Sequence, residues 1–477
     1  MIYPDNSTRT RTVTPSVSAV VRRGSFIRSR SRTDTTGAFA PNVTGGTTMR
    51  RQLLAGTTIL GMIAASAGLS AAVAAGTASA ATSSTPIIVG GDGDLAINAG
   101  VGPGFVAGLY RFNKAGGLDG RKIEFTGFLD DGFSPATNLT NAQQLVENKH
   151  VMVVAPFLSE VSTASTGDFL AGAKTPFIGW DVNDTFVAQP KWGYGINGDQ
   201  ENPIEQNGTV GQILVATHDQ KTPGKVKIAY IAENVAGGIT SNKALAGTAE
   251  YAGMKVVYEK APIAVIGTTN YAPYAQAIIA SGANVAFETL DTGDSVGLAA
   301  ALKQAGFKGP IFNGVTYLPG SLGQSKSEES ALDGVYVVNE FPADENNTPA
   351  IKQAEADLKA TGQPPYLTSG VSIGYWSAIL LEQMLKATLK SVGGNPNDVT
   401  GASIEKTVNS GFTYTDPIAG GIGTEYFPAE ENTPTGCGTL LQTEGAGFKQ
   451  IIPYECLGAI NVAKDKKVDV KTGKIIG

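Results

Sequence analysis

The pentapeptide Gly293-Asp-Ser-Val-Gly297 has the G-x-S-x-G pattern in which a serine acts as a nucleophile. Hydrolases with this pattern need a histidine after the serine in chain order, which takes the proton from the hydroxyl group. The chain has two histidines, His150 and His218, and both precede the pentapeptide. We therefore predict no serine hydrolase site and interpret the match as chance.

The string Gly102-Pro-Gly-Phe-Val-Ala107 has the G-x-G-x-x-A pattern of dinucleotide-binding turns. In those turns the first glycine comes directly after a strand, and the phosphates lie at the N-terminus of the next helix. Here the preceding strand is expected to end near Gly90, too far away, and Pro103 lies inside the turn. We interpret the string as the glycine-rich start of a helix and predict no cofactor.

Metal binding and acid–base chemistry have equally little support. The two histidines and two late cysteines form neither an H-E-x-x-H motif nor a paired C-x-x-C motif, so we predict no metal site. The pair Asp130-Asp131 could transfer protons in principle, but the Gly132 that follows favours a turn. The sequence therefore predicts no catalytic residues, and we do not expect an enzyme.

The elements around these motifs predict a parallel sheet. A buried strand over 86–90 precedes a helix in which Phe105, Leu109 and Phe112 share one face. Gly116-Gly117 ends that helix, and a second strand over 121–128 follows. Strand, helix and strand within about 40 residues form one right-handed βαβ unit.

The same alternation continues along the chain in two blocks. Further strands are predicted at 151–155, 175–179, 225–231, 255–258, 284–287, 310–312 and 334–339, with helices between them and at 349–361, 372–391 and 402–409. A turn is expected at 156–160, after the third strand, and short strands are expected in the tail from 412. The 397 residues after position 80 exceed what one core usually supports, so we predict two lobes.

The N-terminus resembles a targeting sequence. Residues 1–48 are rich in Ser, Thr and Arg, and we expect either a disordered leader or an upstream extension before the true start at Met49. Residues 49–80 combine Arg50-Arg51, an apolar run and the small residues Ala78-Ser79-Ala80, which predicts a signal peptide cleaved after Ala80. A twin-arginine signal and a membrane anchor are the alternatives. No cysteine lies near the cleavage point to carry a lipid.

Charge and cysteines limit the partners and the compartment. After position 80 there are 27 basic and 40 acidic residues, a net charge of −13, which argues against nucleic acid and anionic membranes. Only two arginines remain there, Arg111 and Arg121, so an arginine clamp on a ligand carboxylate is expected only from Arg111. Cys437 and Cys456 are predicted to form a disulfide in an exported chain, with two separate buried thiols as the alternative.

Two strings carry a resemblance to a known family. Phe112-Asn-Lys-Ala-Gly-Gly-Leu-Asp-Gly-Arg-Lys-Ile-Glu124 and Asp130-Asp-Gly-Phe-Ser-Pro-Ala136 resemble the extracellular solute-binding proteins of the branched-chain amino acid (leucine/isoleucine/valine) binding family. Ser134 stands where the family commonly has an aspartate. The resemblance implies an α/β fold of the periplasmic-binding-protein-like I type, with two Rossmann-like lobes, parallel sheets, three hinge crossovers near Ile204, Phe341 and Phe412, and a cleft between the lobes. Lobe 1 would comprise 86–204 plus 341–411, and lobe 2 would comprise 205–340 plus 412–477.

The resemblance also implies where a ligand binds. Ser159 matches a serine after the third strand that holds the ligand, and Asp181-Val182-Asn183 matches a turn of small residues, so Asp181 suggests a more polar ligand. The acid that binds the ligand's ammonium group is absent from its usual place near Thr316-Tyr317, and Asp291 is its expected substitute. Each residue could instead cap a loop. The candidate ligand-binding residues are Asp92, Asp94, Ser159, Trp180, Asp181, Asn183, Asn234, Asp291, Thr316 and Tyr317.

These observations predict an exported, monomeric solute-binding protein, located in the periplasm or cell envelope or secreted. It would capture a small polar molecule, an amino acid or related compound, and deliver it to an ABC-type permease. The alternative is a ligand-sensing or cell-envelope interaction protein on the same fold, without a transporter. The sequence leaves the identity of the ligand open.

Overall fold

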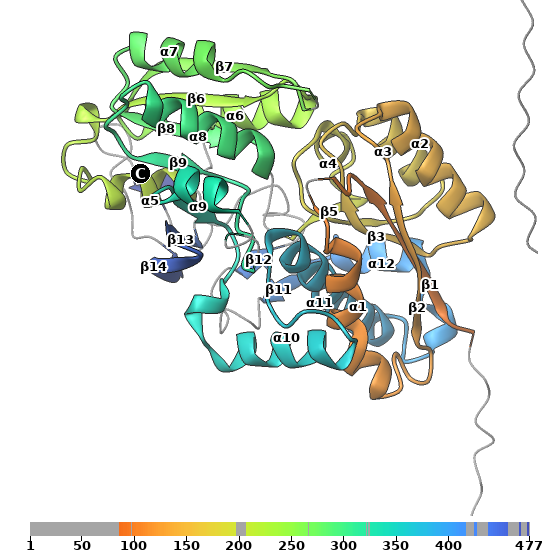
Figure 1. Ribbon diagram of the computed structural model, residues 1–477. Helices are drawn as coiled ribbons and strands as arrows, with labels where there is room; N and C mark the ends of the chain where they lie inside the picture. The colour runs from red at the N-terminus through yellow and green to blue at the C-terminus, as the bar shows by residue number, and fades with distance from the viewer. Residues whose placement is uncertain are drawn as a thin grey trace, which may run out of the picture. The chain divides into compact units, whose positions relative to one another are not determined.

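The structure is a computed structural model, shown in Figure 1. It describes residues 85–96, 98–196, 207–265, 267–320, 322, 325–415, 424–426, 437–456, 467–468 and 475–476. All of these belong to one compact unit, Ser79–Gly477. The predicted leader, 1–48, and signal peptide, 49–80, lie outside the described residues. Within the described part of the chain, no helix is both long and apolar enough to cross a membrane.

The first lobe is built on a five-stranded parallel sheet in the order β2-β1-β3-β4-β5. Its strands are β1 (Ile87–Gly93), β2 (Ile123–Asp130), β3 (Val153–Leu158), β4 (Phe177–Gly179) and β5 (Gly193–Gly195). Its helices are α1 (Val101–Lys114), α2 (Pro135–Gln143, continued by a π-helical turn over Gln144–Asn148), α3 (Ala164–Gly172), α4 (Asp184–Ala188), α10 (Pro349–Ala360), α11 (Ser369–Ser391) and α12 (Gly401–Val408). The predicted βαβ start is thus confirmed.

The second lobe is built on a seven-stranded sheet in the order β14-β13-β10-β9-β8-β6-β7. Its strands are β6 (Lys227–Glu233), β7 (Lys255–Ile263), β8 (Val285–Thr289), β9 (Ile311–Asn313), β10 (Tyr336–Asn339), β13 (Cys437–Glu444) and β14 (Gly447–Cys456). Its helices are α5 (Asn207–Ala216), α6 (Ala236–Tyr251), α7 (Ala272–Ala280), α8 (Thr292–Gln304) and α9 (Lys326–Leu332). Small two-stranded ladders join β11 (Thr413–Thr415) to β12 (Thr424–Tyr426) and β15 (Lys467–Val468) to β16 (Ile475–Ile476).

The tail adds antiparallel strands to an otherwise parallel sheet. The five strands from β7 to β10 pair in parallel, whereas β13 pairs antiparallel with β10, and β14 with β13. Instead of the short strands expected from the Gly-, Pro- and Thr-rich composition, the tail forms strands of 8 and 10 residues. Their register sets Cys437 directly opposite Cys456.

The turn predicted at 156–160 begins three residues too early. Strand β3 continues through Pro156 and Phe157 to Leu158. Proline cannot donate to a ladder, so it is tolerated in a central strand only where the pairing is irregular. Both ladders of β3 shift register here, against β1 between Gly90 and Asp92 and against β4 between Val154 and Phe157. The irregularity accommodates the proline, and the strand continues past it.

Helices α1 and α11 lie side by side in the core of the first lobe, where Phe105 and Leu109 of α1 are buried with the α11 residues Tyr375 and Leu381 (Figure 1). Phe412 and Tyr414, which follow α12, also pack in this core. A second set of buried residues surrounds β6, β8 and β9. Each sheet therefore has its own hydrophobic core, which is the two-lobed α/β fold that the sequence predicts.

Glycines set the close approach of α1 to α11. A Cβ atom on Gly104 would lie 2.2 Å from the Val371 carbonyl oxygen, and one on Gly374 would lie 1.9 Å from the Val101 carbonyl oxygen. Both obstacles are backbone atoms, which cannot move without separating the helices. The contact between the two helices therefore depends on the absence of side chains at these positions.

We predict that Gly374→Ala lowers the free energy of unfolding by roughly 1–3 kcal/mol, because the methyl group overpacks a rigid backbone contact. Gly172→Ala is the matched control, since Gly172 is exposed at the end of α3 and a Cβ atom there meets nothing within 4 Å. The control should keep the parent stability or gain up to about 1 kcal/mol from helix propensity. Urea denaturation measures both changes, and equal stability of the two variants would contradict the argument.

Candidate functional site

A cavity of about 680 Å³, partly open to solvent, is lined by residues at the carboxyl ends of strands in both sheets. Ligands bind to open α/β sheets at this edge, because helix N-termini and loops converge there. From the first lobe come Glu160, Trp180 and Val182, which follow β3 and β4. From the second lobe come residues at or after the ends of β6, β8, β9 and β10, among them Glu233, Thr289, Leu290, Asp291, Gly314, Val315 and Glu340. The N-terminal part of α6 adds Gly237, Gly238, Ser241 and Leu245.

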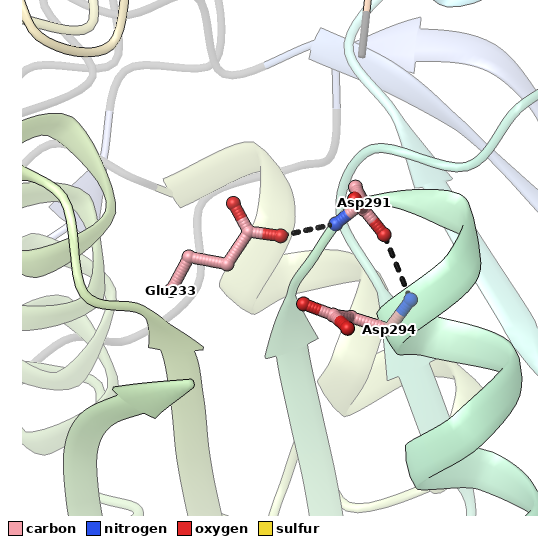
Figure 2. Close-up of side chains that lie close together, drawn as sticks. All are labelled: Glu233, Asp291 and Asp294. Carbon is pink, nitrogen blue, oxygen red and sulfur yellow. Dashed lines mark hydrogen bonds between the residues drawn. The ribbon is translucent and has the colours of Figure 1, made fainter. Parts of the chain in front are cut away.

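Three carboxyl groups gather at the second-lobe side of the site (Figure 2). Glu233 is the last residue of β6, Asp291 is the N-cap of α8, and Asp294 lies in the first turn of α8. One oxygen of each lies within 4.8 Å of an oxygen of the others. The Asp291 backbone N–H donates to Glu233 Oε1 over 2.7 Å, and the Asp291 side chain accepts from the Asp294 backbone N–H over 2.7 Å. The cap therefore fixes the position of the Asp291 carboxylate.

Burial and repulsion disfavour the charged forms of Glu233 and Asp294. Glu233 is only 2% exposed. Burial, with repulsion from Asp291, Asp294 and Asp94, raises the pKa of Glu233 to about 7. Burial also raises the pKa of Asp294, whose carboxylate accepts from the Tyr271 hydroxyl group. Ion pairs between described side chains do not reach this cluster, so its negative charge is not neutralised by a neighbouring Lys or Arg.

Glu160 brings a carboxyl group from the first lobe to the same cavity. Its backbone carbonyl accepts from the Gly237 N–H over 2.9 Å, so the loop after β3 touches the start of α6. A side chain on Gly237 would collide with the loop after β4, because its Cβ atom would lie 2.7 Å from the Val182 carbonyl oxygen. Burial, with repulsion from Asp94 and Glu233, raises the pKa of Glu160 well above its usual value.

Trp180 marks one wall of the cavity. Its indole Nε1–H donates to Glu340 Oε2 over 2.9 Å, which links the end of β4 to the segment after β10. A smaller cavity of about 270 Å³ shares Trp180, Glu340, Gly314 and Val315 and continues toward α11. The Trp180–Glu340 hydrogen bond therefore lies between two adjoining cavities.

The predicted acids of the first lobe are satisfied within that lobe. Asp92 and Asp94 are fully buried and do not line the cavity. Asp92 accepts from the side-chain amides of Asn138 and Asn141 over 3.0 and 2.9 Å. Asp94 accepts from the Asn98 amide over 3.0 Å and from the Glu160 backbone N–H over 3.2 Å. Asp94 thus positions the loop that carries Glu160.

Ser159 and Asn183 also make internal hydrogen bonds and do not line the cavity. The fully buried Ser159 hydroxyl donates to Asp131 Oδ2 over 2.6 Å and accepts from the Val161 N–H over 3.3 Å. Asn183 caps α4 by accepting from the Thr185 N–H, and its amide donates to the Ser159 carbonyl over 2.7 Å.

The other predicted residues divide between the cavity and its surroundings. Trp180 and Asp291 line the cavity, whereas Asp181 is fully buried outside it and Asn234 is exposed. The backbone N–H of the buried Thr316 donates to Asn313 Oδ1 over 2.6 Å. The buried Tyr317 hydroxyl donates to Glu345 Oε2 over 2.7 Å. Neither residue lines the cavity.

Sequence reasoning missed Glu160 and Glu233 as cavity residues. Both follow or end a predicted strand, so the signal that could have found them is an acidic residue at a carboxyl strand end. The resemblance to the solute-binding family pointed to Thr316 and Tyr317 instead. Glu233 lies beside Asp291, the expected substitute for the missing acid.

A further carboxyl group of the second lobe, that of Glu288, is buried next to the cavity. It is 1% exposed on β8, and its Oε1 accepts from the Asn313 side-chain amide over 3.3 Å. The same amide also contacts the Ser295 hydroxyl group. Burial raises the pKa of Glu288 to about 8. Glu288 therefore supports the ends of β8 and β9 in its protonated form near neutral pH.

Two parallel-sheet lobes with a polar cavity at their strand ends define a ligand-binding protein. The family model described as periplasmic binding protein matches residues 88–448, and the chain belongs to this family. The resemblance predicted from the sequence is confirmed. Among curated protein sequences, none matches this chain.

Solved structures share the fold at low identity. A solute-binding protein of an ABC transporter from R. palustris, in complex with 4-hydroxybenzoate, is 20% identical, with a TM-score of 0.59, over 77% of this chain and 96% of that one. Another from R. palustris, in complex with benzoate, is 16% identical, with a TM-score of 0.57, over 77% and 97%. A fatty acid ABC transporter substrate-binding protein from Thermomonospora curvata is 16% identical, with a TM-score of 0.60, over 78% and 92%.

We predict that the free energy of unfolding falls as the pH rises from 5.5 to 8.5. The pKa values of Glu288, Glu233 and Asp94 lie at about 8, 7 and 7 in the folded chain, above the ordinary carboxyl value of about 4 in the unfolded chain. Stability that is fully present below pH 4 is therefore lost as the pH rises through 7 and 8.

Glu288→Gln tests this explanation, because the amide cannot ionise and still accepts from Asn313. The stability advantage of the variant over the parent should be larger at pH 8.5 than at pH 5.5, by roughly 2–4 kcal/mol. Urea denaturation at the two pH values measures the difference. Identical pH dependence in parent and variant would show that Glu288 does not ionise in this range.

Proposed function

We propose that the chain is an exported solute-binding protein that captures a small molecule in the cavity between Glu160 and Glu233. The ligand is an amino acid or a related polar compound, which the protein delivers to an ABC-type permease. The chain acts by binding and performs no chemistry on its ligand. Its place of action is the periplasm or cell envelope, or the medium after secretion.

The observation that carries this proposal is the cavity itself, in a chain of the periplasmic binding protein family. Its walls come from both lobes, which is what a protein that closes around its ligand requires. It combines hydrogen-bonding and charged groups such as Glu160, Ser241 and Thr289 with apolar side chains such as Leu245 and Phe287. Sites for small molecules have this composition, a mostly apolar lining with a few convergent polar groups.

Binding would favour the closed arrangement of the lobes. A ligand that touches both Trp180 and the second-lobe residues makes its full set of contacts only when the two walls are together. Its higher affinity for that state then shifts the population toward it. The chain passes between the two sheets after β5, after β10 and before β13, so that three segments connect the lobes. Such connections suit hinge closure.

The ligands named for the similar structures support a role of this fold in binding small molecules. Their names give 4-hydroxybenzoate, benzoate and fatty acid, and all three are named as ABC transporter proteins. At 16–20% identity they do not define the ligand of this chain. The carboxyl groups in the lining of the present cavity favour an amino acid or related compound instead.

We expect a small molecule to be released when the purified protein is denatured, and mass spectrometry of the released fraction identifies it. Trp180→Phe should then weaken the binding of that compound roughly 10-fold in calorimetry, because it loses the indole N–H that holds Glu340 in the cavity wall. Trp192→Phe is the matched control, since Trp192 packs beside a different core cluster and does not line the cavity.

The control should bind the compound like the parent protein. Equal affinity of the Trp180 variant would place the ligand outside this cavity. Uptake of the compound by cells that lack the chain tests the transport role, and unchanged uptake would favour a sensing or cell-envelope role on the same fold.

Export predicts a disulfide between Cys437 and Cys456. Directly opposed residues in an antiparallel ladder have Cα atoms about 4.5–5.5 Å apart, within the range that a disulfide spans. We expect no thiol to react in the denatured, unreduced protein. Reduction should cost roughly 3 kcal/mol of stability in the chain-entropy model. A titration that finds two thiols per chain, or an unchanged melting temperature on reduction, would contradict the proposal.

A further inference from the structure

The charged residues that line the cavity all have the same sign. Its lining contains four carboxyl groups, those of Glu160, Glu233, Asp291 and Glu340. Among the described residues that line it, none is Lys, Arg or His. Asp294 lies directly behind Glu233 and Asp291, and Asp94 behind Glu160. The cavity therefore presents acidic groups, and no basic ones, on both of its walls.

Glu233 has hydrogen-bonding capacity left over. Glu233 is 98% buried and lines the cavity. Its Oε1 accepts from the Asp291 N–H. Within the described part of the chain, no donor contacts Oε2. A carboxylate oxygen that is largely removed from water and has no donor is costly, so a ligand that supplies a donor gains free energy on binding. Figure 2 shows this second oxygen turned away from the Asp291 backbone.

Glu160 is in a similar position on the opposite wall. Its backbone N–H donates to Asp94, and its backbone carbonyl accepts from Gly237. Burial and repulsion raise the pKa of its carboxyl group. The repulsion comes from Asp94, Glu233, Asp131 and Asp291. Closing the lobes brings Glu160 toward Glu233 and Asp291, which is unfavourable for like charges unless a positive charge lies between them.

The rest of the lining decides the kind of cation. Val182, Leu245, Phe287, Leu290, Val315 and Val338 supply hydrocarbon surface. A calcium ion takes six to eight oxygen ligands and makes no use of an apolar wall. An organic ammonium compound suits both parts of the lining. Its N–H groups reach the carboxylates, and its carbon chain contacts the apolar wall.

We propose that the cavity selects small organic cations, ligands with a net positive charge carried by protonated amines. Glu233 and Asp291 hold an ammonium group from the second lobe, and Glu160 completes its surroundings from the first. This inference rests on the proposed function, whose ligand it narrows to a charge class. It distinguishes the chain from the similar structures whose names give benzoates and a fatty acid, which are anions near neutral pH.

The same arrangement makes closure of the lobes depend on the charge of the ligand. An ammonium group between Glu160 and Glu233 replaces a repulsion by two attractions, and it does so only when the two walls are together. A neutral ligand leaves the repulsion in place, and an anion adds to it. Differential affinity for the closed state therefore depends on the charge of the ligand, not only on its shape.

Calorimetry with the exported protein, freed of endogenous ligand, tests the proposal with five probes. These are 1,5-diaminopentane, lysine, leucine, benzoate and Ca²⁺. We expect a diamine or lysine to bind at least about 100-fold more tightly than leucine, and benzoate to show no binding. Glu233→Gln should weaken binding of the cation roughly 10- to 100-fold, because it removes a charged acceptor but keeps the shape of the side chain.

Two further variants keep the test independent of folding defects. Asp291→Asn preserves the helix cap, since asparagine caps as well as aspartate, and should also weaken cation binding. Glu250→Gln is the matched control, because Glu250 is exposed near the far end of α6, about 20 Å along the helix from Gly237. The control should bind like the parent protein.

Tighter binding of leucine or benzoate than of both cations would overturn the charge class while leaving the solute-binding function intact. Binding of Ca²⁺ that Glu233→Gln abolishes, without binding of either amine, would show a metal site instead and would also overturn the proposal. Unchanged cation binding in both cavity variants, Glu233→Gln and Asp291→Asn, would also overturn the proposal. The released-compound analysis tests the solute-binding function separately, whatever the charge of the compound.

Discussion

Helices cover both faces of the parallel strands in each lobe, and this covering decides where polar groups can be used. The central strands are buried on both faces, as the fully buried residues of β3 and β8 show. A charged side chain in the middle of such a strand would lose its hydration on every side. Only the strand ends, where loops and helix N-termini meet, can present carboxyl groups to a ligand. Glu160, Glu233 and Asp291 all come from that edge.

The two lobes treat their strand-end acids differently. In the first lobe, Asp92 and Asp94 are held by side-chain amides, so these groups shape the loops and make no contact with the cavity. In the second lobe, Glu233 and Asp291 face the cavity, and Asp294 lies against them. The first lobe thus uses its acids for structure, while the second presents them to a ligand. Glu160 is the first-lobe exception, because Asp94 holds its backbone and leaves its side chain to the cavity.

Local patterns predicted the elements well where one physical cause acted alone. The helix around Phe105 and the strands beside it follow from apolar periodicity and from glycines at the boundaries. The prediction that β3 ends before Pro156 was wrong. Proline is a local signal against a strand, but the register shifts that accommodate Pro156 involve two other strands, β1 and β4. The antiparallel addition of β13 and β14 depends likewise on an edge of β10, which no pattern in the tail reveals.

The sequence by itself determined the two-lobed α/β architecture and the excess of negative charge, because these follow from periodicity, length and composition. The family was indicated by the resemblance of two strings to known solute-binding proteins. The sequence also singled out Trp180 and Asp291, since polar and aromatic residues after strands are visible in the chain. Only the tertiary structure decided that Ser159 and Tyr317 are used in internal hydrogen bonds and that Glu160 and Glu233 line one cavity. The reason is that the environment of a carboxyl group depends on residues far away in the chain. Glu233 and Asp291 are 58 positions apart, and their interaction exists only once β6 and β8 pair.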